Sequence, residues 1–127
     1  MRKKEVVLID DDETLVQLIT FALEQRGFTV HSFAKGAVGK EYLLNKSHIA
    51  KTELLILDRM LPDMDGIDIL KALEKKFPGA VPVLILSALS SEKEILKGLS
   101  RGAVDYVGKP FSVPVLVSKV LTLTIKK

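Results

Sequence analysis

The stretch VVLIDDDE, residues 6–13, joins four consecutive apolar residues directly to a run of acidic ones. A short strand that is apolar without alternation must be buried on both faces, as the strands of a parallel sheet are. Two carboxylates about 4 Å apart repel by roughly 1 kcal/mol in water and by about 4 kcal/mol near a protein surface. We therefore expect a buried parallel strand that ends at a group able to offset this repulsion: a metal ion, a lysine or solvent.

Four further apolar runs of strand length follow along the chain, separated by segments with helical spacing. Leu15, Ile19 and Ala22 lie at positions i, i+4 and i+7, and Gly27 ends the helix that they predict. This alternation predicts a doubly wound α/β sheet, in which right-handed crossovers place helices on both faces. The predicted strands are residues 6–9, 28–33, 54–57, 81–86 and 104–107. The other helical patterns contain Val38, Tyr42 and Leu43; Ile67, Leu70 and Leu73; Ile95 and Leu99; and residues 113–125.

Length and composition limit the class of protein. A chain of 127 residues, 47% of them hydrophobic, predicts one domain over residues 1–127. The absence of cysteine excludes disulfides and thiolate sites, so a metal would need oxygen or histidine ligands. The net charge is +3, but the basic residues are dispersed and not interleaved with aromatic residues, which indicates solvated helix faces rather than nucleic-acid contact. With no apolar run of signal-peptide or membrane-span length, the expectation is a soluble cytoplasmic protein that does not bind membranes.

The residues directly after the predicted strands carry the chemistry, because ligands of doubly wound sheets bind beyond the carboxyl ends of the strands. Oxygen ligands without histidine or cysteine suit a hard cation such as Mg²⁺, and an aspartate beside the cation can act as a nucleophile toward a phosphoryl group. A lysine would neutralise phosphoryl oxygens and a serine would donate a hydrogen bond. Any one aspartate there can instead be a helix N-cap, as we expect for Asp12. The residues in question are Asp10, Asp11, Asp12, Asp58, Ser87 and Lys109.

Four motifs, in order and covering the whole chain, make the sequence resemble a response-regulator receiver domain. VVLIDDDE resembles the acidic pair after the first strand, and LLILDRMLPDMDG (54–66) the phosphoacceptor strand with its loop. VLILSA (83–88) and GAVDYVGKPF (102–111) resemble the fourth and fifth strands with their serine, aromatic and Lys-Pro. The resemblance implies a flavodoxin-like (βα)5 fold with strand order 2-1-3-4-5.

The resemblance also implies roles for particular residues. Asp58 would accept the phosphoryl group. Mg²⁺, or another divalent cation such as Mn²⁺, would be held by Asp10, Asp11, Asp58 and the backbone carbonyl of Met60, with Asp11 the more direct ligand and Asp10 acting largely through water. Lys109 would pair with the phosphate, and its peptide bond to Pro110 would be cis.

The implied function is a phosphorylation-activated signalling switch rather than a conventional enzyme. Once Asp58 is phosphorylated, Ser87 would move inward and Tyr106 would turn from exposed to buried, which changes the face formed by the fourth helix, fifth strand and fifth helix. The implied partners are a histidine kinase or phosphotransfer protein, a small phosphodonor in their place, a downstream effector and, under phosphorylation, a second copy of the chain. Only self-phosphorylation and self-dephosphorylation are expected as chemistry.

Two local features extend this interpretation. We expect residues 45–53 to form a loop that is longer than usual for the family. This segment also lacks the Pro-Asp that is common in the family before the third strand. Met60 and Leu89 lie two residues beyond Asp58 and Ser87, and apolar side chains there would give an attacking water no hydrogen-bonding partner. We therefore expect a long-lived phosphoryl group.

Two rival functions have different consequences. Asp10, Asp12 and Thr14 spell D-x-D-x-T, which resembles the nucleophile motif of haloacid-dehalogenase-like phosphatases, with Asp10 as nucleophile. That family needs a further acidic pair after its lysine, and no aspartate or glutamate follows Lys109. The second rival is a receiver-like module that binds a partner without being phosphorylated.

Overall fold

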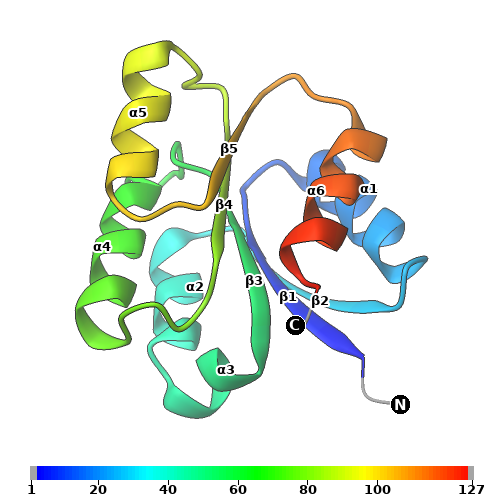
Figure 1. The fold of residues 1–127 in the computed structure, drawn as a ribbon, viewed down its shortest axis with the longest axis horizontal. Helices are drawn as coiled ribbons and strands as arrows, with labels where there is room; N and C mark the ends of the chain where they lie inside the picture. Colours follow the sequence, from blue (N-terminus) through cyan, green and yellow to red (C-terminus); the bar gives the residue numbers. More distant parts are fainter. Residues whose placement is uncertain (1–2, 126–127) are drawn as a thin grey trace.

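The computed structural model describes residues 3–125, which form one parallel sheet flanked by helices (Figure 1). The strand order is β2-β1-β3-β4-β5, so the predicted doubly wound sheet with order 2-1-3-4-5 is confirmed. The strands are β1 (Lys4–Ile9), β2 (Phe28–Phe33), β3 (Thr52–Leu57), β4 (Val83–Ser87) and β5 (Asp105–Gly108). The helices are α1 (Glu13–Glu24), α2 (Gly36–Leu43), α3 (Lys46–Lys51), α4 (Gly66–Lys76), α5 (Glu92–Ser100) and α6 (Val113–Leu123).

The central strand β1 explains why its sequence is apolar without alternation. Val6 and Leu8 lie in the core beneath α1 and α6, whereas Val7 and Ile9 lie in the core beneath α2, α4 and α5. All four side chains are fully buried. Figure 1 shows the same division, with α1 and α6 on one side of the sheet and the other helices on the opposite side.

The segment 45–53 was expected to be a loop, and this expectation was wrong because it contains the short helix α3. The side-chain oxygen of Asn45 caps the helix by accepting hydrogen bonds from the backbone amides of Ser47 (2.9 Å) and His48 (3.2 Å). Ile49 fixes the helix on the core, with 3% of its surface exposed. A helix of six residues is too short to show a repeating apolar pattern.

Two apolar positions of the predicted helical patterns are exposed: Val38 is 51% exposed and Leu99 is 39% exposed. Their helices pack through glycines, which carry no hydrophobic signal. A Cβ atom at Gly39 would lie only 2.4 Å from the Ile9 side chain, and one at Gly98 would lie 2.8 Å from Tyr106. In α2 and α5 these glycines, and not Val38 or Leu99, thus lie closest to the side chains of the sheet.

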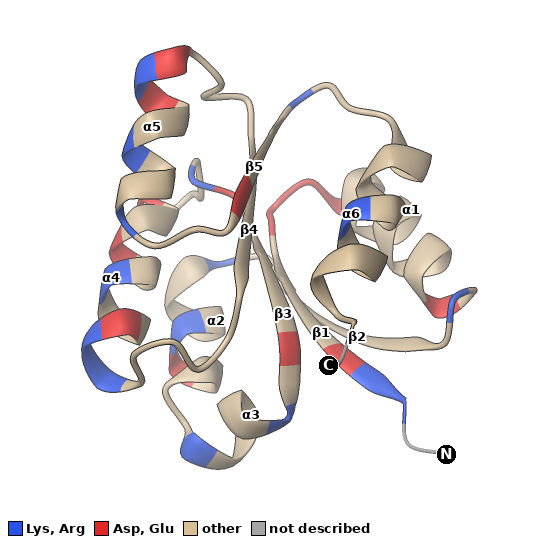
Figure 2. Ribbon diagram, in the orientation of Figure 1, with Lys and Arg blue, Asp and Glu red and all other residues tan. Residues whose placement is uncertain are grey.

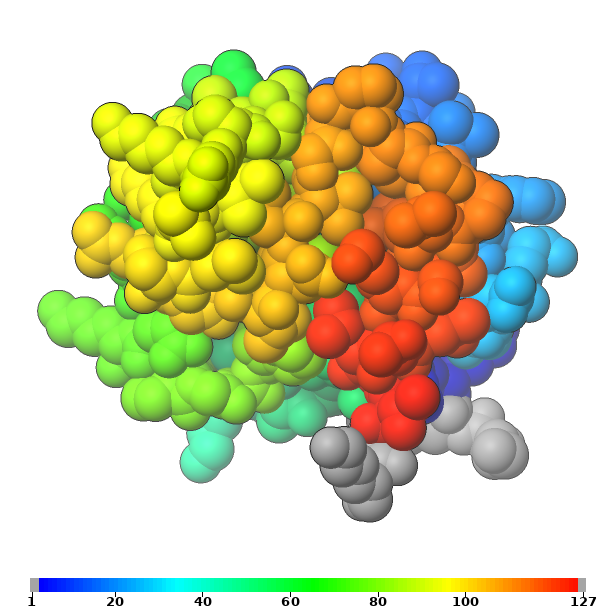
Figure 3. Space-filling model, turned by 45° about the horizontal axis from the view of Figure 1, so that its top comes forward, coloured from blue at the N-terminus to red at the C-terminus, as the bar shows by residue number. Residues whose placement is uncertain are grey.

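The outer helix faces carry mixed charge. Figure 2 shows basic and acidic positions interspersed along α4 and α5, while the segment between β1 and α1 is acidic. In the space-filling view, α5 and the segment that runs through β5 into α6 lie side by side at the surface (Figure 3). Within residues 3–125, no helix has both the length and the apolar character needed to span a membrane.

Gly66, at the start of α4, is expected to tolerate no side chain. A Cβ atom there would lie 2.2 Å from the backbone carbonyl oxygen of Asp58 and 3.0 Å from the Cα of Arg59. Gly66→Ala should lower the free energy of unfolding by about 2 to 3 kcal/mol, because only backbone movement relieves the clash. Urea denaturation measures this. Asp68→Ala on the exposed side of the same helix is the control, with an expected change within about 0.5 kcal/mol.

Candidate functional site

The carboxyl ends of β1, β3 and β4 bring three predicted site residues to one edge of the sheet. Asp10 and Asp58 are buried, with 2% and 4% of their surfaces exposed, and Ser87 is fully buried. Parallel pairing causes this, since Ile9 and Leu57 are partners across β1 and β3, and the Asp58 amide donates to the Ile9 carbonyl (3.0 Å). Asp11, one residue further along, is exposed.

Lys109 joins the two buried carboxylates. Its Nζ atom lies 2.8 Å from Asp10 Oδ2 and 3.0 Å from Asp58 Oδ2. Burial works against the charge of Lys109, but the hydrogen bonds to Asp10 and Asp58 prevail and raise its pKa. Burial also raises the pKa of Asp10, which the Lys109 contact only partly counters. The peptide bond from Lys109 to Pro110 is cis, the isomer that the resemblance implies.

The remaining negative charge at this edge fits a divalent cation. Asp10, Asp11 and Asp58 each offer an oxygen, and these atoms lie within 4.8 Å of one another. Three carboxylates and one ammonium leave a formal charge of −2. Hard oxygen donors are the ligands that Mg²⁺ prefers. Met60, whose backbone carbonyl is the fourth predicted ligand, donates its amide to Asp58 Oδ1 (3.0 Å); its role toward a cation stays a prediction.

Asp12 is the N-cap of α1 and not part of the carboxylate cluster. Its Oδ1 atom accepts a hydrogen bond from the Leu15 amide at 3.1 Å. Its own amide donates to Asp10 Oδ1 at 2.9 Å, which helps to orient that carboxylate. The cap was predicted from sequence, and it removes from the site the second aspartate of the phosphatase-like motif.

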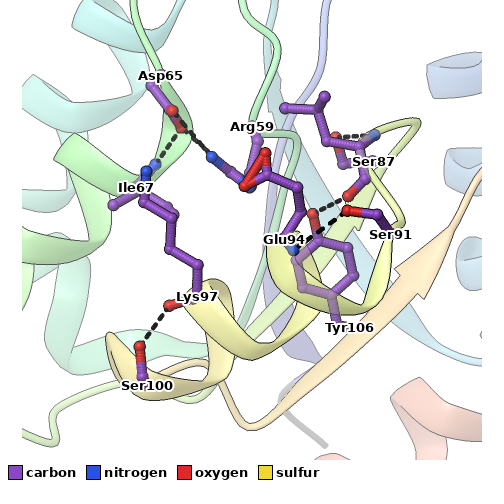
Figure 4. Close-up of polar contacts among 10 residues, drawn as sticks. Arg59, Asp65, Ile67, Ser87, Ser91, Glu94, Lys97, Ser100 and Tyr106 are labelled. Carbon is purple, nitrogen blue, oxygen red and sulfur yellow. Dashed lines mark hydrogen bonds and ion pairs between the residues drawn. The ribbon is translucent and has the colours of Figure 1, made fainter.

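Ser87 and Tyr106 meet through the segment after β4. The Leu89 amide donates to Ser87 Oγ (3.2 Å), and the Leu89 carbonyl accepts a hydrogen bond from the Tyr106 hydroxyl (Figure 4). Tyr106 is 8% exposed, so its ring is inward. This is the position that the resemblance assigns to the phosphorylated state.

Sequence reasoning missed two polar residues of the loop that follows Asp58. Arg59 is 3% exposed and forms ion pairs with Asp65 and Glu94, although nothing in a single arginine predicts its burial. Asp63 accepts hydrogen bonds from the amides of Gly36 (2.8 Å) and Ala37 (2.9 Å), which lower its pKa and attach the loop to the start of α2. Its place in a Pro-Asp pair, at residues 62–63, was the available signal.

Comparison with known proteins decides the family. The profile of the response regulator receiver domain matches residues 6–121. The chain belongs to the receiver-domain family. It is 38% identical over 109 residues to the alkaline phosphatase synthesis transcriptional regulatory protein PhoP of Bacillus subtilis (86% of this chain, 43% of the relative). It is 37% identical over 123 residues to the transcriptional regulatory protein CreB of Escherichia coli (97% of this chain, 52% of the relative).

Solved receiver domains share the fold. The non-phosphorylated HemR receiver domain of Leptospira biflexa has a TM-score of 0.87 at 27% identity, covering 98% of this chain and 97% of that one. The receiver domain of Francisella response regulator 1452 has a TM-score of 0.84 at 34% identity, covering 95% and 96%. This receiver domain spans about half the length of the curated relatives that it matches. Because the chain belongs to this family, it is a regulatory domain of the two-component type, and neither rival function is favoured.

Proposed function

We propose that this receiver domain accepts a phosphoryl group on Asp58 in the presence of Mg²⁺ and transmits the change to the face formed by α5, β5 and α6. Because α3 adds a helix, α5 and α6 are the fourth and fifth helices predicted from the sequence. The observation that supports this most directly is Lys109, whose ammonium bridges the buried carboxylates of Asp10 and Asp58. Two further observations support the proposal: Asp58 is buried at the carboxyl end of a central strand, and the exposed carboxylate of Asp11 lies beside it.

The proposed reaction is an in-line transfer. An Asp58 carboxylate oxygen forms a bond to phosphorus while the bond from phosphorus to the donor's nitrogen or oxygen breaks, and the donor leaves with that electron pair. Lys109 would then pair with a phosphoryl oxygen, since its ammonium already contacts Asp58 Oδ2. Mg²⁺, held by Asp10, Asp11, Asp58 and the Met60 carbonyl, would neutralise charge on the equatorial oxygens when bound.

The switch would use the groups that already meet at Leu89. A phosphoryl oxygen is a strong acceptor for the Ser87 hydroxyl, and movement of Ser87 would carry the segment that receives the Tyr106 hydrogen bond. Shifting a two-state equilibrium from 1:99 to 99:1 takes about 5.5 kcal/mol. A few charge-assisted hydrogen bonds of roughly 1.5 to 3 kcal/mol each supply this.

The proposed partners follow from the family. A histidine kinase or phosphotransfer protein would supply the phosphoryl group, and an effector domain or protein would read the altered face. Leu96, Leu99 and Val104 leave that face apolar and exposed, which suits a protein effector or a second copy of the chain. We place this exchange in the cytoplasm and assign no nucleic-acid contact to the receiver domain itself.

The test is incubation with a small phosphodonor such as phosphoramidate, followed by intact-mass measurement. With Mg²⁺, the protein should gain one phosphoryl group, and with excess chelator it should gain none. Failure to gain mass with any donor would contradict the proposal and favour the module that binds without phosphorylation. A gain that is independent of divalent cations would contradict the role given to the carboxylate cluster.

The phosphoryl group is expected to be long-lived because of Met60 and Leu89, which lie at the edge of the site and offer no hydrogen bond from their side chains to an attacking water. Met60 is 54% exposed, so solvent reaches this side chain. Met60→Asn should shorten the lifetime, because the amide would orient water. Decay after removal of the donor measures this by intact mass, and a lifetime of seconds in the parent protein would contradict the expectation.

A further inference from the structure

Arg59 is a buried cation that the phosphoryl chemistry does not use. Only 2% of its side chain is exposed, and its guanidinium lies between two carboxylates from different elements (Figure 4). Nη2 lies 3.1 Å from Asp65 Oδ2, and Nη1 lies 3.2 Å from Glu94 Oε1. Burial opposes the charge, but the contacts with Asp65, with the nearby Tyr106 hydroxyl and with Glu94 raise the pKa of Arg59, so it stays a cation.

Arg59 belongs to the loop of residues 58–65, which begins at the proposed phosphoacceptor Asp58 and is called the phosphoacceptor loop below. Backbone hydrogen bonds fix Arg59 within it. Arg59 directly follows Asp58, and its carbonyl accepts hydrogen bonds from the amides of Leu61 (3.2 Å) and Gly66 (2.8 Å). Asp65, which holds one side of the guanidinium, is the N-cap of α4 and accepts from the Ile67 amide at 2.9 Å. The Arg59 guanidinium is therefore anchored to the phosphoacceptor loop and to the start of α4.

The other side of the guanidinium reaches the first turn of α5, which supports the inward Tyr106. Glu94 belongs to this turn, where its amide donates to the N-cap Ser91. Further along α5, a Cβ atom at Gly98 would lie 2.8 Å from a Tyr106 ring carbon, so the ring occupies the space that a side chain would fill. The position of α5 thus decides whether the Tyr106 ring fits inward.

We propose that Arg59 is a positioning residue of the switch: through its ion pair with Glu94 it holds α5 against the phosphoacceptor loop in the arrangement that accepts the inward Tyr106. The inference rests on the proposed function only in assigning the inward Tyr106 to the phosphorylated state. Breaking the pair should shift Tyr106 outward while leaving Asp58, Lys109 and the carboxylate cluster intact, since none of them contacts Glu94 among the interactions of residues 3–125.

The size of the effect follows from the kind of contact. A hydrogen bond between charged groups contributes more than a neutral one, and the Glu94 side chain is only 27% exposed, so solvent screens it incompletely. Glu94→Ala should lower the ratio of inward to outward Tyr106 roughly tenfold. Glu94→Gln, which keeps an oxygen acceptor without the charge, should give a smaller decrease. Asp65 still neutralises Arg59 in both variants, so both are expected to fold.

Fluorine NMR of protein labelled with 3-fluorotyrosine can measure this ratio, because the chain has only two tyrosines. Tyr42→Phe assigns the signals, and the Tyr42 signal itself reports intact folding near α2. Gly98→Ala, which fills the space of the ring, gives the outward reference. Intact mass after treatment with phosphoramidate and Mg²⁺ shows in parallel whether each variant is still phosphorylated.

Glu92→Ala is the matched control, because Glu92 lies in the same first turn of α5 but is exposed and forms no ion pair within residues 3–125. We expect Glu94→Ala to be phosphorylated like the parent but shifted toward outward Tyr106, and Glu92→Ala to match the parent in both. An unchanged Tyr106 signal in Glu94→Ala, or an equal shift in Glu92→Ala, would overturn the inference. Absence of phosphorylation in the parent would instead count against the proposed function, while the Tyr106 comparison would still decide the positioning role.

Discussion

Asp58→Asn is expected to abolish phosphorylation completely under conditions in which the parent protein gains one phosphoryl group. The amide has no carboxylate oxygen to attack phosphorus, but its size and shape are the same. Its single side-chain oxygen can still accept from the Met60 amide, as Asp58 Oδ1 does (3.0 Å). The NH2 group that replaces Oδ2 cannot accept from Lys109, but Lys109 keeps its contact with Asp10 (2.8 Å). The expected loss is therefore one of chemistry and not of structure, and intact mass measures it.

Asp12→Asn is the control for this prediction. Asp12 is also an aspartate and lies near the cluster, but it is exposed and caps α1. Asparagine is also a good N-cap, so the variant should fold and be phosphorylated like the parent. Loss of phosphorylation in Asp12→Asn would show that the acidic run acts as one unit and would contradict the division of labour described above.

Lys109→Met is expected to have the largest effect on stability. The substitution leaves Asp10 and Asp58 buried without the cation that both contact, and breaking a buried pair in this way costs about 3 to 5 kcal/mol of unfolding free energy at neutral pH. Added Mg²⁺ should recover part of the loss by neutralising the same carboxylates. Lowering the pH should also reduce the deficit, because burial raises the pKa of Asp10 and protonation removes an unpaired charge.

The same change at Lys119 separates loss of this bridge from loss of any lysine. Lys119 pairs with Asp105 at 2.7 Å, but both side chains are more than one third exposed. Lys119→Met should therefore change the unfolding free energy by no more than about 1 kcal/mol, and Mg²⁺ should not affect the difference. Equal effects of the two variants in urea denaturation would contradict the role of Lys109 at the site.

Much of the fold was predictable because burial on both faces leaves a strong signal. The apolar runs of β1 and β3 carry it, and the residues that follow them, Asp10 and Asp58, are brought together by parallel pairing alone. Packing through glycine was not predictable, because Gly39 and Gly98 contribute closeness rather than hydrophobicity. Helix α3 was missed for a different reason, since six residues are too few to establish a period.

The site divides in the same way. Lys109 and the carboxylates could be named because each follows a strand, and sheet topology places such residues together. Arg59 could not be assigned, although it directly follows Asp58, because its partner Glu94 is 35 residues away on a helix whose position depends on packing. Long-range ion pairs of this kind leave no local pattern, so only the structure reveals the connection between the phosphoacceptor loop and α5.

We propose that Asp58, and not an aspartate of the acidic run, receives the phosphoryl group. Reduction of the phosphorylated protein with borohydride converts an aspartyl phosphate into homoserine, which peptide mass mapping locates. We predict homoserine in place of Asp58 and at no other aspartate. Homoserine in place of Asp10 would exclude Asp58 as the acceptor and point to the phosphatase-like nucleophile instead.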